Sequence, residues 1–138
     1  MLQESPLYAY FQARDLDRAR RFWEDKLGFA PKSADNGGVT YAFANGTAAF
    51  LYPTGNAGTS KASQAFWSVE DVDREMAELK KRGVEFEHDD VPGERSPEGA
   101  ITAGGAKAAS FKDSEGNTLA IVQDLSHQAS SRSASQLP

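Results

Sequence analysis

Apolar and polar residues alternate along Leu7–Ala13, which is the pattern of a strand that buries one face. Asp15 then stands where a helix N-cap is expected, because its carboxylate can accept hydrogen bonds from the unpaired N–H groups of a first helical turn. Gly28 comes about a dozen residues later and is a residue type that commonly ends a helix. Between them, apolar residues recur at helical spacing at Leu16, Ala19, Trp23 and Leu27. The pattern therefore predicts a strand followed by an amphipathic helix.

A hairpin is predicted next, around Asn45-Gly46, because this dipeptide is a strong signal for a two-residue turn between alternating segments. The flanking segments are Val39–Ala44 and Thr47–Tyr52. A two-residue turn pairs Tyr41 with Phe50, and directly paired residues share one face of a sheet. We therefore expect one face of this hairpin to be aromatic, with four rings together, those of Tyr41, Phe43, Phe50 and Tyr52.

The second half of the chain repeats this plan. Asp71-Val72-Asp73-Arg74 matches Asp15-Leu16-Asp17-Arg18, and each copy follows an alternating segment and precedes a helical pattern that ends at a glycine. A unit present only twice indicates duplication of one module rather than a repeat array. The elements expected in this half are a strand over Ala62–Val69, a helix over Asp71–Arg82, a strand over Val84–His88, a loop over Asp89–Ala100 and a hairpin of Lys107–Lys112 with Asn117–Gln123.

These elements predict an α+β fold of two βαβββ modules that form a curled mixed sheet with the helices on its outer face. Residues 1–56 are expected to be the first module and residues 57–125 the second, with a flexible linker from Pro53 to Lys61. Residues 126–138 are rich in serine and lack hydrophobic periodicity, so we expect a disordered tail there.

Composition excludes several classes of function. The chain of 138 residues has a formal net charge of −5, which disfavours nucleic acid as a partner and favours neutral or cationic ligands. It has no cysteine, so disulfides, thiolate metal sites and cysteine nucleophiles are excluded. No apolar segment is long enough to span a bilayer, and Met1–Pro6 lacks the pattern of a signal peptide. These features predict a cytoplasmic protein that does not act at a membrane.

Several short motifs are spread along Leu7–Gln123, nearly the whole chain. They are Ala13-Arg14-Asp15-Leu16-Asp17-Arg18-Ala19, Phe22-Trp23, Leu27-Gly28-Phe29, Val69-Glu70-Asp71-Val72, Arg82-Gly83-Val84 and Phe111-Lys112-Asp113-Ser114-Glu115-Gly116-Asn117-Thr118-Leu119. Together they resemble the vicinal oxygen chelate superfamily, which includes glyoxalase I, extradiol dioxygenases, fosfomycin-resistance enzymes and bleomycin-resistance proteins. The resemblance implies paired βαβββ modules, often assembled as a dimer, around a cleft in the curled sheet.

In the metalloenzymes of that superfamily, His or Glu side chains from four strands hold a divalent cation in this cleft. By the resemblance, the matching positions here are Tyr8, Phe50, Gln64 and Ala120. Zinc, iron and manganese sites need imidazole and carboxylate donors, and none of these four side chains supplies one at neutral pH. We therefore expect no metal cofactor, and no other cofactor.

Rings and amides take the place of metal ligands in the expected cleft. The side chains that strand alternation directs to the face opposite the helices, and that we predict to contact a ligand, are Tyr8, Tyr10, Gln12, Tyr41, Phe43, Phe50, Tyr52, Gln64, Phe66 and Ser110. The rings could instead fill a core, or be covered by a second subunit. The two glutamines could hold a ligand, or pair with each other or with tyrosines.

Other candidate chemistry is weak. His88-Asp89-Asp90 is the one stretch that resembles a metal cluster, but neighbouring side chains in a strand point to opposite faces and cannot all meet at one ion. The sequence has no phosphate-binding glycine motif and no arrangement that predicts a Ser-His-Asp triad.

Three hypotheses follow. The first is a homodimer of the bleomycin-resistance type that sequesters a planar, aromatic, antibiotic-like compound without changing it. The second is an enzyme of the same fold, a lyase or isomerase of secondary metabolism, in which Tyr8 or Tyr10 acts as acid or base. The third is an interaction module whose aromatic face is wholly a dimer interface.

Overall fold

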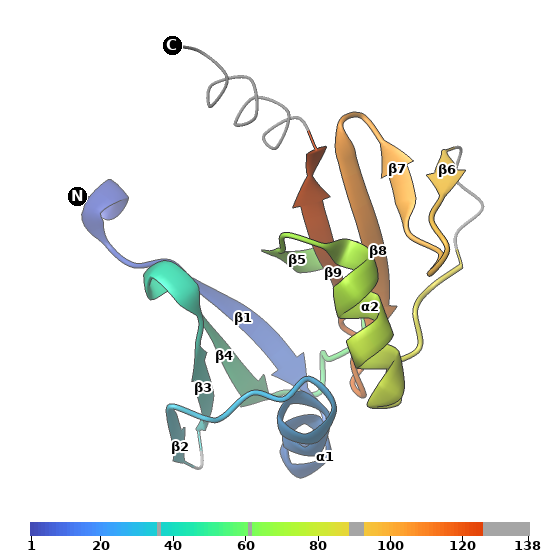
Figure 1. Ribbon diagram of the computed structural model, residues 1–138. Helices are drawn as coiled ribbons and strands as arrows, with labels where there is room; N and C mark the ends of the chain where they lie inside the picture. Colours follow the sequence, from blue (N-terminus) through green and yellow to red (C-terminus); the bar gives the residue numbers. More distant parts are fainter. Residues whose placement is uncertain (36, 61, 89–92, 126–138) are drawn as a thin grey trace. The chain divides into compact units, whose positions relative to one another are not determined.

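The computed structural model describes residues 1–35, 37–60, 62–88 and 93–125, and the predicted tail lies outside them (Figure 1). The chain forms two compact units. The first contains Met1–Gln64 together with the later segment Lys112–Thr118. The second contains the described residues of Ala65–Phe111 and of the segment from Leu119 to Leu125. Each unit has its own sheet and its own helix, so the predicted α+β class is confirmed.

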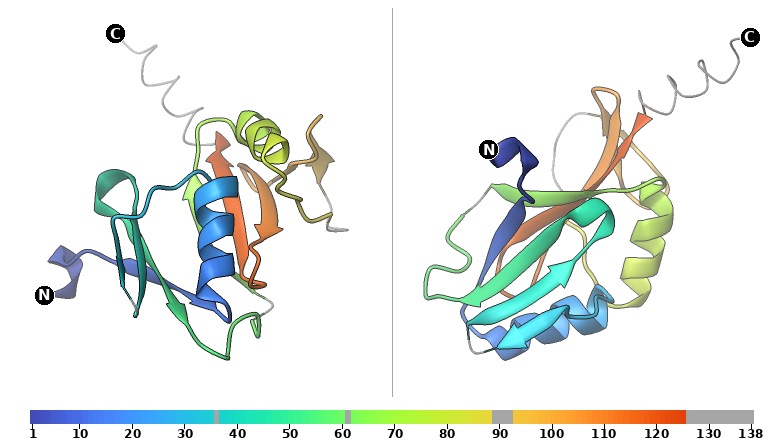
Figure 2. Two further views of the ribbon diagram at one scale, coloured as in Figure 1. Left: turned by 90° about the horizontal axis from the view of Figure 1, so that it is seen from below. Right: turned by 90° about the vertical axis from the view of Figure 1, so that its left-hand side faces the viewer.

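The first unit is built on a four-stranded sheet in the order β1-β4-β3-β2. Its strands are β1 (Tyr8–Ala13), β2 (Ser33–Asp35), β3 (Gly38–Ala42) and β4 (Ala48–Pro53). β1 runs parallel to β4, and the other neighbouring pairs are antiparallel. A single 3₁₀ turn, η1 (Leu2–Glu4), precedes β1, and η3 (Ala44–Gly46), whose Asn45 has non-helical backbone angles, precedes β4. Figure 2 gives two further views of this sheet and of the helix α1 beside it.

Helix α1 (Leu16–Arg21) begins where the sequence predicts, because the Asp15 carboxylate accepts a hydrogen bond from the backbone N–H of Arg18 at 3.0 Å. It continues as a π-helical turn, η2 (Phe22–Lys26), and the chain leaves it at Gly28. One face of this helix packs on the sheet through buried side chains. They are Ala19 and Trp23 on the helix and Phe11, Val39, Tyr41 and Leu51 on the strands.

The predicted register of the hairpin around Asn45-Gly46 is wrong by one residue. The turn itself forms, since Asn45 and Gly46 both have positive φ and the Thr47 N–H donates to the Ala44 carbonyl at 3.2 Å. The N–H of Phe43 also donates to the Thr47 carbonyl, at 2.8 Å, so β3 carries one extra residue beside the turn, as in a β-bulge. As a result Tyr41 pairs with Ala49 and not with Phe50.

The buried carboxylate of Glu115 connects the segment Lys112–Thr118 to the start of α1 through hydrogen bonds. Glu115 accepts hydrogen bonds from the backbone N–H groups of Arg14 at 2.9 Å and Asp15 at 3.0 Å. It also accepts from Nε of Arg18 at 2.7 Å and from the hydroxyl of Ser114 at 2.9 Å. Burial alone would raise the pKa of Glu115, but the hydrogen bonds from Arg18, the Asp15 backbone and Ser114 outweigh it and lower the pKa to about 2.

A second buried carboxylate in the same segment joins it to the helix. Asp113 accepts a hydrogen bond from Nε1 of Trp23 at 3.1 Å and from Nδ2 of Asn117 at 2.8 Å. Nδ2 of Asn117 also donates to the backbone carbonyl of Gln12 at 2.9 Å. Asn117 therefore connects the turn to the end of β1 as well.

The second unit is built on a five-stranded sheet in the order β5-β9-β8-β7-β6. The strands are β5 (Ser63–Ser68), β6 (Glu94–Arg95), β7 (Ile101–Ala103), β8 (Ala106–Lys112) and β9 (Thr118–Asp124). Helix α2 (Val72–Lys81) is capped by Asp71, whose side chain accepts from the Arg74 N–H at 3.1 Å. Val72 and Met76 of α2 form a buried core with Ala100 and Ile121, against which Trp67, Leu79 and Ala109 pack.

Two predictions for the second unit are wrong. The strand expected over Val84–His88 is reduced to one bridge between Phe86 and Phe111. The described part of the expected loop Asp89–Ala100 contains β6, and β7 follows it directly. Both strands are too short to show an alternating pattern in the sequence.

No helix within the described residues is long and apolar enough to cross a bilayer.

Candidate ligand-binding site

Strand alternation and the parallel register of β1 with β4 bring three rings together in the first unit. Tyr10 lies opposite Phe50, and the ring of Tyr10 meets Phe50 at 6.1 Å and Tyr52 at 5.3 Å between centroids, edge to face in both cases. Phe50 and Tyr52 lie nearly parallel, at 6.3 Å and 10°. Tyr8 is on the same side of β1, two residues before Tyr10. We call Tyr8, Tyr10, Phe50 and Tyr52 the aromatic face.

The aromatic face is open to solvent, whereas the other side of the same sheet is a packed core. Tyr10 is 66% exposed and Tyr8 46% exposed, and Phe50 and Tyr52 are partly buried. On the opposite side, Phe11 of the same strand is 2% exposed. The core alternative that the sequence left open therefore does not apply to Tyr8 and Tyr10 in this structure.

Gly38 at the start of β3 makes room for one of these rings. Its φ is +150°, and a Cβ atom there would lie 2.7 Å from Cζ of Phe50 and in contact with the backbone oxygen of Leu51. A side chain at this position would therefore displace the ring or the strand. The sequence offered no sign of this role, because it depends on the register of β3 with β4.

Tyr41 and Phe43 do not belong to the aromatic face. The extra residue in β3 turns them toward the helix, since a one-residue slip moves every side chain of a strand to the other face. Tyr41 is fully buried, stacks on Trp23 at 5.3 Å and 23°, and donates its hydroxyl to Glu24 at 2.9 Å. Phe43 meets the ring of Phe29 at 5.0 Å.

Tyr41 is expected to titrate later than an ordinary tyrosine. Burial, followed by the hydrogen bond to Glu24, raises the pKa of Tyr41 well above its usual range. In an alkaline titration followed at the tyrosinate absorbance, one component should therefore appear only at very high pH or when the protein unfolds. Tyr41→Phe should remove this late component, and Tyr10→Phe should leave it in place. A late component that survives in Tyr41→Phe would show that another tyrosine is responsible.

The two glutamines predicted for the site are paired with each other. Gln64 lies in β5, at the end of the segment Met1–Gln64 of the first unit, and its Nε2 donates to Oε1 of Gln12 at 3.1 Å. Gln12 lies opposite Tyr52 in the register of β1 with β4, so the pair borders the aromatic face. The hydrogen bond from Asn117 to the Gln12 carbonyl was missed from the sequence, although Asn117 belongs to a motif that carries the family resemblance.

The other predicted residues, Phe66 and Ser110, belong to the second unit. Their neighbours Trp67 and Ala109 pack against the core under α2, so Phe66 and Ser110 lie on the opposite face of that sheet. Phe66 is 62% exposed and Ser110 is partly buried. Both side chains therefore lie on the sheet face opposite α2, and their contact with a ligand stays a prediction.

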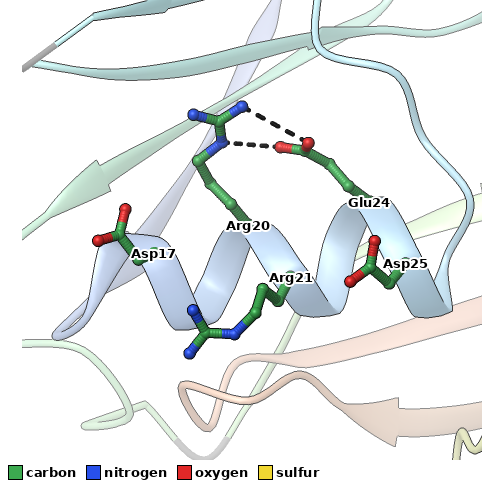
Figure 3. A pocket seen from close by; sticks show the side chains of 5 residues that line it. All are labelled: Asp17, Arg20, Arg21, Glu24 and Asp25. Atoms are coloured by element: carbon green, nitrogen blue, oxygen red, sulfur yellow. Dashed lines mark hydrogen bonds and ion pairs between the residues drawn. The ribbon is translucent and has the colours of Figure 1, made fainter.

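The hollow drawn in Figure 3 does not have the chemistry of a site. It has a volume of about 290 Å³ and lies along α1 and η2. Charged side chains of both signs line it, namely Asp17, Arg20, Arg21, Glu24 and Asp25. Arg20 and Glu24 form an ion pair at 2.8 Å across one helical turn, which is an ordinary feature of a solvated helix face.

Comparison with protein-family models shows the family of the chain. The model of the Glyoxalase/Bleomycin resistance protein/Dioxygenase superfamily matches residues 7–121. The chain belongs to this superfamily. Sequence comparison with curated proteins gives no significant match.

Solved structures of several proteins share the fold. TnmS3, an antibiotic binding protein from Streptomyces sp. CB03234, gives a TM-score of 0.66 at 19% identity and covers 90% of this chain and 98% of its own. A glyoxalase/bleomycin resistance protein/dioxygenase from Alicyclobacillus acidocaldarius gives 0.68 at 20% identity, with 91% and 95% covered. A lactoylglutathione lyase from Agrobacterium tumefaciens gives 0.61 at 16% identity, with 87% and 93% covered. Identities this low establish the fold alone.

The side chains at the superfamily's metal positions do not fit a divalent cation. Tyr8 and Phe50 stand on the aromatic face, Gln64 is paired with Gln12, and Ala120 in the second unit has no donor atom. Within the described residues, no three His, Cys, Asp or Glu side chains are grouped to hold a metal. His88 is exposed, and its neighbours Asp89 and Asp90 lie outside the described residues.

Proposed function

We propose that this chain binds a planar, aromatic small molecule on the aromatic face and sequesters it, in the manner of the bleomycin-resistance proteins. The observation that carries the proposal is the group of three touching rings on the open side of β1 and β4, with Tyr10 66% exposed. Exposed large rings are costly to leave in water, and a contiguous group of them is typical of a binding surface.

The chemistry of the surface favours binding over catalysis. Rings stack on flat partners of many kinds, and the tyrosine hydroxyls can hydrogen bond to a polar edge. The net charge of −5 favours a neutral or cationic compound over an anion. Sequestration then follows from mass action alone, because tight binding lowers the free concentration of the compound with no bond made or broken.

Fluorescence quenching against a panel of planar antibiotics tests the proposal. We expect saturable quenching by one class of compound, unchanged by added Zn²⁺, Mn²⁺ or Fe²⁺, with the compound recovered intact. Binding only in the presence of a metal, or a compound that returns chemically altered, would instead indicate the lyase or isomerase of the second hypothesis. Quenching by no compound would contradict a ligand-binding role for the aromatic face.

The homodimer and the cytoplasmic location predicted from the sequence belong to this proposal. Gel filtration tests the first of them. A monomer would also remove the hypothesis that the aromatic face serves only as a dimer interface.

A further inference from the structure

The amide pair beside the aromatic face offers an unused donor and an unused acceptor. A glutamine amide has two N–H donors and one carbonyl oxygen. The hydrogen bond between the two side chains uses one N–H of Gln64 and the carbonyl oxygen of Gln12. Nε2 of Gln12 and Oε1 of Gln64 form no side-chain hydrogen bond with the rest of the described chain. Within the described chain, the N–H groups on Nε2 of Gln12, the second N–H of Gln64 and the carbonyl oxygen of Gln64 therefore remain available to a ligand.

Hydrogen bonds from a buried side chain fix the backbone of Gln12. The backbone carbonyl of Gln12 accepts from Nδ2 of Asn117 at 2.9 Å, and the same Nδ2 donates to the buried Asp113 at 2.8 Å. Both glutamine side chains are partly buried. A partly buried amide that is already fixed by one hydrogen bond loses little further freedom when a ligand binds.

We propose that the ligand carries a carbonyl group and an N–H side by side on one edge of its ring system, as in a lactam or a cyclic imide. Its carbonyl accepts from Nε2 of Gln12 and its N–H donates to Oε1 of Gln64, while its rings lie on the aromatic face. This inference rests on the proposed function and adds the chemical class of the compound.

Selectivity follows from the burial of the amides under a bound ligand. A flat compound that covers the pair removes water from both amide groups. A compound with a matching edge replaces the lost hydrogen bonds, and a compound without one leaves a donor and an acceptor unpaired. Sites that hydrogen bond a ligand discriminate more strongly than apolar surfaces for this reason.

Two isomeric probes distinguish the contribution of the lactam edge to binding from that of ring stacking. Phenanthridinone and acridone have the same atoms and both are fused three-ring compounds. In phenanthridinone the N–H and the carbonyl are neighbours on one edge, whereas in acridone they lie on opposite sides of the central ring. Calorimetric titration should give phenanthridinone an affinity about tenfold higher, as expected for two matched hydrogen bonds.

Variants of the pair complete the experiment. Gln64→Met and Gln12→Met keep the length of the side chain and remove its hydrogen bonding. Each should lower the affinity for phenanthridinone about tenfold, to the level of acridone, and leave acridone binding unchanged. Gln3→Met, at an exposed glutamine of η1, is the matched control and should change neither. Thermal unfolding of each variant checks that the first unit is intact.

The possible failures are distinct. Equal affinities for the two isomers, unaffected by Gln12→Met and Gln64→Met, would overturn the lactam edge and leave the proposed stacking function standing. Binding of neither isomer up to its solubility limit would overturn the lactam edge. It would contradict the proposed function only if no compound of the antibiotic panel quenched the fluorescence either.

Discussion

Glu115→Gln is expected to lower the free energy of unfolding by about 3 kcal/mol at neutral pH, the value of a pKa held at about 2 in place of 4.5. The Glu115 side chain is fully buried, and its carboxylate serves the guanidinium of Arg18 and two backbone N–H groups at once. An amide in its place supplies one acceptor oxygen and turns an NH₂ group toward these donors. Leaving buried donors without their acceptor is costly, although the Arg18 side chain itself is half exposed.

The pH dependence of stability should identify the same group. Because the folded protein holds the pKa of Glu115 below its unfolded value, the stabilisation is fully present above about pH 4.5 and is lost as the pH falls toward 2. Urea unfolding measured between neutral pH and pH 2 should therefore show a decline in the wild type that is much smaller in Glu115→Gln.

Glu98→Gln provides the matched control. Glu98 also forms an ion pair, with Lys80 at 2.9 Å, but both side chains are more than a third exposed. Exposed pairs of this kind contribute at most about 1 kcal/mol. A loss in Glu115→Gln no larger than that in Glu98→Gln would show that the first unit does not depend on this carboxylate.

Local signals in the sequence predicted the parts of the fold that depend on neighbouring residues. Asp15 and Asp71 cap their helices because a cap needs only a carboxylate at the right place before an amphipathic run. The alternation of β1 likewise placed Tyr8, Tyr10 and Gln12 on the correct face. These interactions span three residues or fewer, so the local sequence pattern is enough to predict them.

The predictions were wrong where the structure depends on contacts between distant parts of the chain. One extra residue next to the Asn45-Gly46 turn moved Tyr41 from the predicted aromatic face into the core, and no residue type in Val39–Ala44 announces that bulge. The anchoring of Glu115 to Arg18 joins residues 97 positions apart, so no periodicity can show it. Gln12 and Gln64 were both singled out, but their pairing with each other was one of several alternatives until the structure was known.

Tyr10→Ala combined with Phe50→Ala is expected to weaken the binding of phenanthridinone by about 3 kcal/mol, more than a hundredfold, because stacking on each ring contributes on the order of 1–3 kcal/mol. Tyr41 is left unchanged in this test, because it is buried against Trp23 in the core of the unit and does not belong to the aromatic face. The measurement is a calorimetric titration of the double variant beside the wild type.

The free energy of unfolding of the double variant should show whether weaker binding comes from the loss of stacking or from unfolding of the protein. Tyr10 is 66% exposed, so its truncation removes little buried area, and partly buried Phe50 should account for about 1 kcal/mol of destabilisation. Phe22→Ala is the control, because Phe22 is also a partly buried ring but lies on the helical turn η2 beneath Lys26, at 5.5 Å from its Nζ. It should leave the affinity unchanged. If the double variant binds as tightly as the wild type, the ligand does not stack on the aromatic face, and the site must be sought elsewhere on the chain.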